Sequence, residues 1–303
     1  MSAIPTPSPV RPAPLGFIGL GVMGEPMCRN LARKSGRPVL AHDLRPEPLA
    51  RLAADGVRAA PDLAAVAREA EIIFLSLPSG AEVEAVVAGP DGLVERARAG
   101  QIVVDMSTSP VPLMRRLAEA LAQKGACFAD APVARTRRAA TEGTLAITVG
   151  AKPETFAAIE PLLAFMGTEI THCGPVGAGQ TVKLMNNMVL FTTVLALAEA
   201  MAIAARAGVE EATLLDALSH GSADSFALRN HAMKAMLPRD FPADAFSTDY
   251  ALKDLRYAIE LAREAGIDPQ SARLASDVLA CSSAAGQGPL YFPALLRIIA
   301  DEL

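Results

Sequence analysis

Cysteine is scarce in this chain, and its spacing argues against two kinds of site. The 303 residues include four cysteines with no CxxC pair among them: Cys28, Cys127, Cys173 and Cys281. Neither a disulfide framework nor a zinc site is therefore expected, and this usage fits a reducing, cytoplasmic compartment. The four histidines are scattered without metal-ligand spacing, so we expect no metal site.

Aromatic residues are few, and neither sign of charge is in large excess. Aromatic residues make up 4% of the chain, and 28 basic residues are opposed by 33 acidic ones. Because no basic stripe with interleaved aromatics occurs, we expect no nucleic-acid partner. The most apolar run, residues 184–198, is interrupted by four polar residues, so we expect no membrane span. Residues 1–14 lack the features of a signal peptide and, being rich in proline and serine, predict a flexible tail.

A glycine-rich turn follows the first strand-like segment, residues 15–19. Its GxGxxG spacing, followed by an apolar-periodic helix, is typical of a dinucleotide-binding loop: Gly19, Leu20, Gly21, Val22, Met23 and Gly24. The first glycine permits a tight turn, the second lets the backbone approach a pyrophosphate, and the third lets the helix pack closely. The phosphates would lie at the helix N-terminus, where free N–H groups point outward.

Asp43 ends the next predicted strand, residues 38–43. Its distance from Gly24 along the chain is close to the roughly 20 residues expected for the carboxylate that binds a ribose 2′-hydroxyl. Such a carboxylate repels a 2′-phosphate, so the sequence favours NAD, with NADP less favoured because Arg45 lies nearby. The alternative is that Asp43 is only a strand-end cap or turn residue.

Strand and helix signals alternate through the first half of the chain. Expected strands at 72–77, 101–106, 127–130, 145–149 and 169–173 predict an α/β, Rossmann-type doubly wound sheet. Ligands bind at the carboxyl ends of such strands. Four residues that follow two of these strands are therefore candidate cofactor contacts: Leu77, Pro78, Ser107 and Thr108. The alternative for Ser107 and Thr108 is that they only cap the next helix.

The second half of the chain is helical in pattern, with no strand signal. Residues 180–207 contain no glycine or proline and are apolar nearly all round, which predicts a long buried helix. Further helices are expected at 211–218, 226–236, 248–264, 269–284 and 293–302. We therefore predict a tail over 1–14, a dinucleotide-binding domain over 15–176 and an all-α substrate and oligomerisation domain over 177–303. A second subunit could complete the helical core, giving a homodimer or homotetramer.

Lys183 and Asn187 stand out on the long helix. Four residues apart, they share one helix face. A lysine on the inner face of an apolar helix is costly unless it is used. On spacing alone, the alternative is a lysine whose stem packs while its ammonium group reaches water.

Four motifs in this order resemble the β-hydroxyacid dehydrogenase family, over about residues 15–288. Residues 19–31 resemble its GLGxMGxxMAxNL cofactor motif, and 130–133 with 143–145 resemble the ends of its substrate motif. Residues 177–187 resemble its catalytic motif, and 253–255 its KDL motif. The resemblance implies hydride transfer between NAD(H) and a small 3-hydroxy acid or its semialdehyde, as in 3-hydroxyisobutyrate dehydrogenases.

The resemblance also implies residue roles. Lys183 would carry the catalysis, Asn187 would help to hold the substrate, and Lys253 would lie near the cofactor. A lysine that is hydrogen-bonded to the reacting oxygen can polarise it and shuttle its proton. Burial beside a positive nicotinamide would lower the pKa of that lysine.

One departure from the family concerns the substrate loop. The family usually has Ser-Gly-Gly where this chain has Ala134, Arg135 and Thr136. A guanidinium suits a carboxylate, sulfonate or phosphate, so we expect a small substrate with an anionic tail. The loop is similar to that of sulfolactaldehyde reductases, which keeps a sulfolactaldehyde or succinate semialdehyde reductase open. Another possibility is that Arg135 is solvated and the loop binds through its backbone.

The family also often has an acid after the glycine-rich turn at 286–288, and none occurs here.

Three other protein classes share parts of this pattern. Imine reductases usually replace the catalytic lysine, which this chain keeps as Lys183. Phosphogluconate dehydrogenases are longer and NADP-directed. A non-catalytic dinucleotide-binding module would be expected to lose the lysine or the glycines, and both are present.

Overall fold

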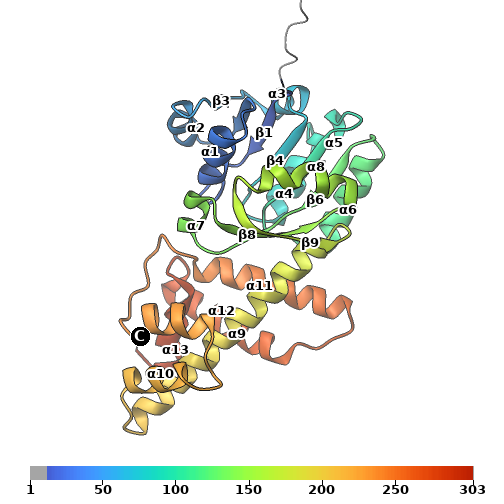
Figure 1. Cartoon of the computed structure of the whole chain (residues 1–303). Coiled ribbons are helices and arrows are strands. Elements are labelled where there is room, and N and C mark those ends of the chain that lie inside the picture. The colour runs from blue at the N-terminus through green and yellow to red at the C-terminus, as the bar shows by residue number, and fades with distance from the viewer. Residues whose placement is uncertain (1–11, 303) are drawn as a thin grey trace, which may run out of the picture. The chain divides into compact units, whose positions relative to one another are not determined.

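A computed structural model describes residues 12–302 (Figure 1). The chain forms two compact units: one holds residues up to Thr108 and Pro112–Gly179, and the other holds Ser109–Val111 and the residues from Gln180 onward. The predicted boundary lay at 176/177. Most of the predicted tail falls outside the described residues, whereas the carbonyl oxygens of Ala13 and Pro14 accept hydrogen bonds from the first unit.

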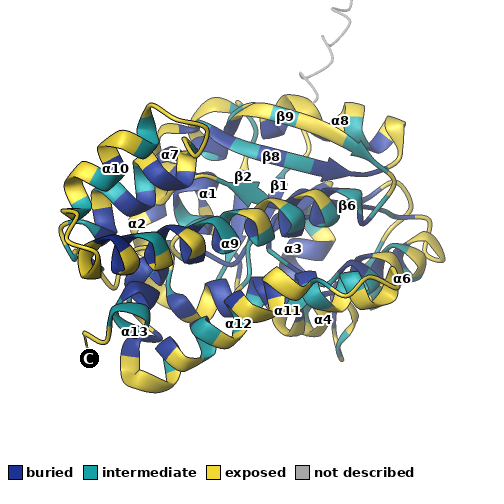
Figure 2. Ribbon diagram, turned by 90° about the horizontal axis from the view of Figure 1, so that it is seen from below, coloured by how far each residue is buried: buried dark blue, intermediate teal, exposed yellow. Residues whose placement is uncertain are grey.

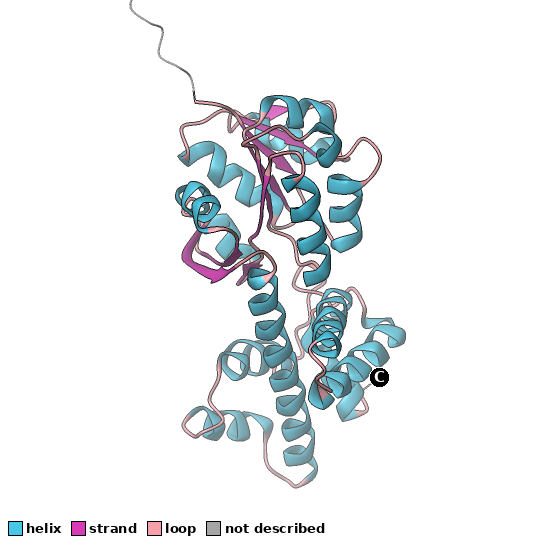
Figure 3. Cartoon of the chain, turned by 90° about the vertical axis from the view of Figure 1, so that its right-hand side faces the viewer, coloured by secondary structure: helices cyan, strands magenta, loops and turns pink. Residues whose placement is uncertain are grey.

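The first unit contains every strand of the described chain (Figure 3). The strand order is β3-β2-β1-β4-β5-β6-β8-β7, with β9 paired to β8. The strands are β1 (Leu15–Ile18), β2 (Val39–His42), β3 (Arg58–Ala59), β4 (Ile72–Leu75), β5 (Ile102–Asp105), β6 (Cys127–Asp130), β7 (Val133–Ala134), β8 (Leu145–Gly150) and β9 (Gly167–Gly174). Strands β1 to β6 pair in parallel, and β8 runs antiparallel to β6 and β7. The predicted doubly wound fold is confirmed.

Both faces of the sheet are covered, which explains the continuous apolar runs of the central strands. Successive side chains of β4 enter different cores: Ile72 and Phe74 belong to one, Ile73 and Leu75 to the other. The first core includes residues of α1 (Gly24–Lys34), α2 (Pro46–Ala53), α7 (Arg137–Glu142) and α8 (Pro153–Leu163). The second includes residues of α3 (Leu63–Glu69), α4 (Gly80–Ala88), α5 (Leu93–Arg96) and α6 (Val111–Ala122). The strand order reverses between β1 and β4, which is where ligands bind in such sheets.

The described residues of the second unit form helices joined by loops, with no strand. Its elements are α9 (Ala178–Arg206), α10 (Glu211–Ser219), η1 (Leu228–Met236), α11 (Thr248–Glu264), α12 (Gln270–Ser282), η2 (Ser283–Gln287), η3 (Phe292–Leu295) and α13 (Leu296–Ala300). The helix expected at 226–236 is a π-helix over most of its length. The sequence could not predict this helix type, because apolar spacing does not separate π-helices from α-helices. The expected helix at 269–284 ends at Ser282, before a π-turn with Gly286 at φ 83°.

Helix α9 is the spine of this unit. It has 29 residues and a mean hydropathy of 2.0 over its most apolar window, so by length and composition alone it could cross a membrane. Side chains such as Leu184, Phe191 and Met201 are buried in the unit's core, whereas Val189 and Ile203 are exposed. Figure 2 shows buried and exposed residues alternating along α9, as in a helix covered on one side.

Candidate active site

The glycine-rich loop between β1 and α1 has the backbone geometry of a close-packed turn. Gly19 has φ 89°, and a Cβ atom there would lie 2.3 Å from the carbonyl oxygen of Ser76. A Cβ atom on Gly24 would lie 2.1 Å from the carbonyl oxygen of Gly19. Any larger residue at either position would displace backbone, so the loop needs both glycines.

The loop leaves room where a pyrophosphate would lie. A Cβ atom on Gly21 would meet no atom within 4 Å. Helix α1 begins at Gly24 behind Met23, and the side chain of Met23 does not cap the first N–H groups of the helix. Leu20 is buried beneath the loop, and Val22 is exposed. These residues fit a bound dinucleotide.

Asp43 is joined directly to this loop. Its Oδ2 accepts the N–H of Leu20 (2.6 Å), and its Oδ1 accepts the N–H of Arg45 (2.8 Å). Partial burial raises the pKa of the Asp43 carboxyl, but the hydrogen bonds from Arg45 and Leu20 outweigh burial and leave it below its ordinary value. An ionised carboxylate is thus held at the end of β2, as ribose recognition requires. The Nε of Arg45 lies 3.3 Å from the same carboxylate.

The loops after β4 and β5 are joined by a serine. The hydroxyl of Ser107 accepts the N–H of Leu77 (2.9 Å), and the N–H of Ser107 donates to Oδ1 of Asp105 (2.9 Å). Strands β4 and β5 are neighbours, so this bond ties adjacent loops at the carboxyl edge of the sheet. Pro78 and Thr108 follow directly in the two loops. The structure thus brings these four predicted residues together.

The substrate loop contains a short helix that the sequence did not predict. The hydroxyl of Thr136 accepts the N–H of Ala139 (3.4 Å) and caps α7, which ends at Gly143 in the left-handed conformation. Thr136 therefore has a structural task in addition to its predicted role at the substrate. The signal that could have located α7 is a threonine followed, a short helix later, by a glycine.

Arg135 lies just before this helix with φ 85°, a conformation that favours glycine. This explains why the family has glycine at this position. The guanidinium Nη1 donates to the carbonyl oxygen of Thr144 (2.6 Å) and to Oγ1 of Thr168 (3.2 Å), and Nη2 lies 4.0 Å from Glu169. Ala134 precedes it at the end of β7, half-buried and paired with Ala146.

Lys183 is buried in the helical unit, with 9% of its surface exposed. That small exposure disfavours the alternative in which the ammonium group reaches water. Burial lowers the pKa of Lys183, the negative charge of Asp254 raises it, and the positive charge of Lys253 lowers it. The balance lies below the ordinary value for lysine, as a group that both accepts and donates a proton requires.

Asn187 is fixed by two hydrogen bonds. Its Nδ2 donates to Oδ2 of Asp254 (2.7 Å), and its Oδ1 accepts from Nδ2 of Asn186 (3.1 Å). Because a carboxylate only accepts hydrogen bonds, the amide nitrogen must face Asp254. Asp254 is 1% exposed, and sequence reasoning missed its part in the site. The signal was the acid of the KDL motif, 67 residues from Asn187 along the chain.

Lys253, the predicted cofactor residue of this unit, lies beside the same carboxylate. Its Nζ is 3.2 Å from Oδ1 of Asp254 and 5.4 Å from the ring centres of both Tyr250 and Tyr257. The predicted residues thus divide into a cofactor and substrate-loop group in the first unit and a group around Lys183 in the second.

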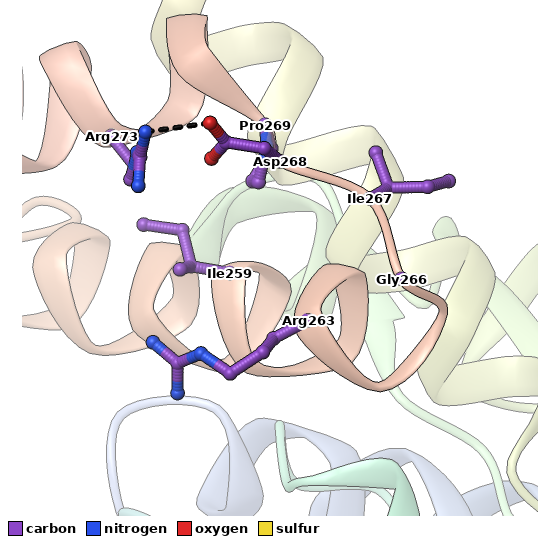
Figure 4. Close-up of a pocket in the computed structure, with 7 residues that line it drawn as sticks. All are labelled: Ile259, Arg263, Gly266, Ile267, Asp268, Pro269 and Arg273. Carbon is purple, nitrogen blue, oxygen red and sulfur yellow. Dashed lines mark hydrogen bonds and ion pairs between the residues drawn. The ribbon is translucent and has the colours of Figure 1, made fainter.

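A separate pocket lies at the turn between α11 and α12 and includes none of the predicted residues (Figure 4). Apolar side chains such as Ile259 line it, and Arg273 pairs with Asp268 at its edge (2.7 Å). Among residues 12–302, no group of three or more His, Cys, Asp or Glu side chains could hold a metal ion.

Two family models match consecutive parts of this chain. Residues 14–174 match the family model for the NAD binding domain of 6-phosphogluconate dehydrogenase. Residues 177–299 match the model described as NAD-binding of NADP-dependent 3-hydroxyisobutyrate dehydrogenase.

The matches to individual relatives cover between 71% and 95% of this chain. The 2-(hydroxymethyl)glutarate dehydrogenase of Eubacterium barkeri is 35% identical, covering 94% of this chain and 94% of that protein. A 3-hydroxyisobutyrate dehydrogenase of Pseudomonas aeruginosa is 37% identical over 71% of this chain and 72% of its own length. The solved structure of Mycobacterium tuberculosis 3-hydroxyisobutyrate dehydrogenase with L-serine has a TM-score of 0.86 at 30% identity, covering 95% of this chain and 99% of that one.

These relatives are dehydrogenases, which sets aside the non-catalytic binding module. The chain therefore belongs to the β-hydroxyacid dehydrogenase family and is an NAD(P)-dependent hydroxyacid dehydrogenase.

Proposed function

We propose that this enzyme interconverts a small 3-hydroxy acid and its semialdehyde, with Lys183 as the proton carrier. The observation that carries the proposal is the buried lysine with a lowered pKa, one helical turn from a fixed asparagine. Hydride transfer requires the hydroxyl to lose its proton in one direction and the carbonyl oxygen to gain one in the other. A buried lysine with a lowered pKa gives up its proton more readily than an ordinary lysine, so it can serve both directions.

The chain's own residues would divide the work as follows. The loop from Gly19 to Gly24 and the carboxylate of Asp43 would hold the dinucleotide, which supplies the hydride acceptor or donor when bound. Neutral Lys183 would accept the hydroxyl proton during oxidation, and its ammonium form would return that proton during reduction. Asn187 would donate its remaining amide N–H to the reacting oxygen or to the substrate carboxylate.

An anionic tail on the substrate is the finer part of the proposal. The compounds in the relatives' names, 3-hydroxyisobutyrate and 2-(hydroxymethyl)glutarate, share a hydroxymethyl group beside a carboxylate, and the second carries another carboxylate. Nη1 of Arg135 is bonded within the loop, but Nε forms no hydrogen bond among the described residues, and Nη2 has only the distant Glu169. These donors could bind such a tail, and Ala134 and Thr136 would shape the loop around it.

NAD is the proposed cofactor, with NADP less favoured. The ionised Asp43 at the end of β2 supports NAD because it repels a 2′-phosphate. Asp43→Asn should raise kcat/KM for NADPH relative to NADH by about tenfold, and an unchanged ratio would contradict the cofactor assignment.

A second copy of this chain is the proposed partner. The uncovered side of α9 carries exposed Val182, Val189 and Ile203, which support burial against another subunit in a homodimer or homotetramer. No nucleic-acid or membrane partner is proposed. The four cysteines are free, which supports a cytoplasmic location. Light scattering of the purified protein tests the assembly, and a monomer at micromolar concentration would refute it.

The substrate proposal is tested by NADH oxidation with methylmalonate semialdehyde, tartronate semialdehyde, succinate semialdehyde and sulfolactaldehyde, and by NAD⁺ reduction with 2-(hydroxymethyl)glutarate. Lys183→Ala should abolish turnover with every compound, and full activity would overturn the mechanism. Arg135→Ser should lower kcat/KM for 2-(hydroxymethyl)glutarate, the doubly anionic compound of this set, by about tenfold. The matched control is Arg137→Ser, an exposed arginine of the same loop. Equal effects of the two variants would contradict anion recognition by Arg135.

A further inference from the structure

The helical unit contains a buried acid for which the reaction scheme has no task. Lys183 and Asp254 are the charged residues buried among its described residues, and Asp254 is the less exposed of the two, at 1% against 9%. An ionised carboxylate removed from water is costly unless other groups compensate its charge. The groups around Asp254 therefore indicate what it does.

The two oxygens of Asp254 meet different partners. Oδ2 accepts from the amide of Asn187 (2.7 Å), and Oδ1 lies 3.2 Å from Nζ of Lys253. Oδ1 nonetheless has no partner that meets hydrogen-bond geometry. The contact with Lys253 is thus mainly electrostatic, and within residues 12–302 the directed bond of this carboxylate is to Asn187.

We propose that Asp254 is a positioning residue that orients the amide of Asn187 toward the substrate and holds the positive charge of Lys183. This inference rests on the proposed role of Lys183. It adds to that role a residue that touches neither substrate nor cofactor and acts through its two neighbours on α9.

Orientation of the amide follows from the chemistry of the acceptor. Because the carboxylate cannot donate, Asn187 can present only its nitrogen to Asp254, which sets the direction of the remaining N–H. An asparagine at position 254 could present either end of its amide. Asn187 could then flip, and the substrate would meet an oxygen in place of an N–H in part of the molecules.

Asp254 is bonded to Asn187, which shares one face of α9 with Lys183, and its charge acts on Lys183 in the opposite sense to burial. Burial in the unit and the positive charge of Lys253 both lower the pKa of Lys183. The carboxylate of Asp254, on α11, raises the pKa of Lys183. Without it, Lys183 would lose its proton at lower pH, so less of the ammonium form would be available for reduction at neutral pH.

The test compares Asp254→Asn with Glu260→Gln, which removes an exposed acid from the same helix. We expect Asp254→Asn to lower kcat for semialdehyde reduction at least about tenfold and to move the alkaline limb of the pH profile down by about one pH unit. Affinity for NADH should stay unchanged. Glu260→Gln should leave kcat and the pH profile as in the wild type.

Three outcomes are decisive. A wild-type kcat and pH profile in Asp254→Asn would overturn the inference, while inactivity of Lys183→Ala would still support the proposed function. Activity of Lys183→Ala would instead overturn the proposed function itself. If Asp254→Asn does not fold, Asp254→Glu decides: it keeps the charge but displaces the carboxylate, so kcat should fall while the alkaline limb stays in place. An unchanged kcat in Asp254→Glu would overturn the inference.

Discussion

Replacing Arg135 by alanine and by glycine separates the backbone strain of the substrate loop from its side-chain hydrogen bonds. Both variants lose the bonds from Nη1 to Thr144 and Thr168. Only the glycine variant also relieves the φ of 85° that the arginine adopts. The difference between the two variants therefore measures the strain.

The magnitudes can be worked out from these contacts. Losing two partly exposed hydrogen bonds should cost about 1–2 kcal/mol in either variant. Glycine recovers about 1–2 kcal/mol of left-handed strain but adds about 0.5–1 kcal/mol of chain entropy to the unfolded state. We therefore expect the glycine variant to be more stable than the alanine variant by about 0.5–1 kcal/mol.

Hydrogen exchange of the amides of β7 and β8, followed by mass spectrometry, is the suitable assay. The chain has no tryptophan, and its three tyrosines, Tyr250, Tyr257 and Tyr291, all lie in the helical unit, so fluorescence would not report on this loop. We expect slower exchange of β7 and β8 in the glycine variant than in the alanine variant. Equal protection, or greater protection in the alanine variant, would refute the assignment of strain to Arg135.

Two further predictions concern buried titratable groups in the helical unit. Lys183 has a lowered pKa, so the unfolded chain binds more protons below the ordinary value of 10.5. Lys183→Met should therefore raise the free energy of unfolding at pH 7 by about 1–2 kcal/mol, and this gain should shrink as the pH rises toward 10.5. The measurement is urea titration followed by circular dichroism, and a lower free energy of unfolding in the variant would contradict the prediction. Burial lowers the pKa of His231 from 6.5 to about 4, so stability should fall by up to about 3 kcal/mol as pH drops from 6.5 to 4. In acid titrations, His231→Phe should remove this pH dependence of the free energy of unfolding, whereas the exposed control His220→Phe should keep it. An unchanged pH dependence in His231→Phe would show that the imidazole of His231 does not cause it.

The cofactor loop could be predicted because its rules are local. Gly19 needs glycine for its φ of 89° and Gly24 for its close contact with Gly19, and Asp43 lies at a fixed distance along the chain. The alternation of strands and helices likewise follows from short-range patterns. These features were therefore readable without any knowledge of tertiary contacts.

The features that could not be predicted depend on contacts between distant residues. The left-handed backbone of Arg135 accompanies hydrogen bonds from its guanidinium to Thr144 and Thr168, and the sequence of the loop alone does not predict these contacts. Asp254 reaches Asn187 across 67 residues of chain. The π-helix η1 was expected as an α-helix because its apolar pattern fits both.

The hydrogen bonds of Asn187 set a limit on how the substrate can be recognised. A primary amide has two N–H groups, and one of them is committed to Asp254, while the amide oxygen is already engaged by Asn186. Asn187 can therefore offer a single donor, which serves either the reacting oxygen or the carboxylate at any one moment. Substrates that keep a carboxylate beside the carbinol must find the rest of their donors on other residues, so chemical selectivity in this enzyme is shared across the chain and does not reside in the catalytic helix alone.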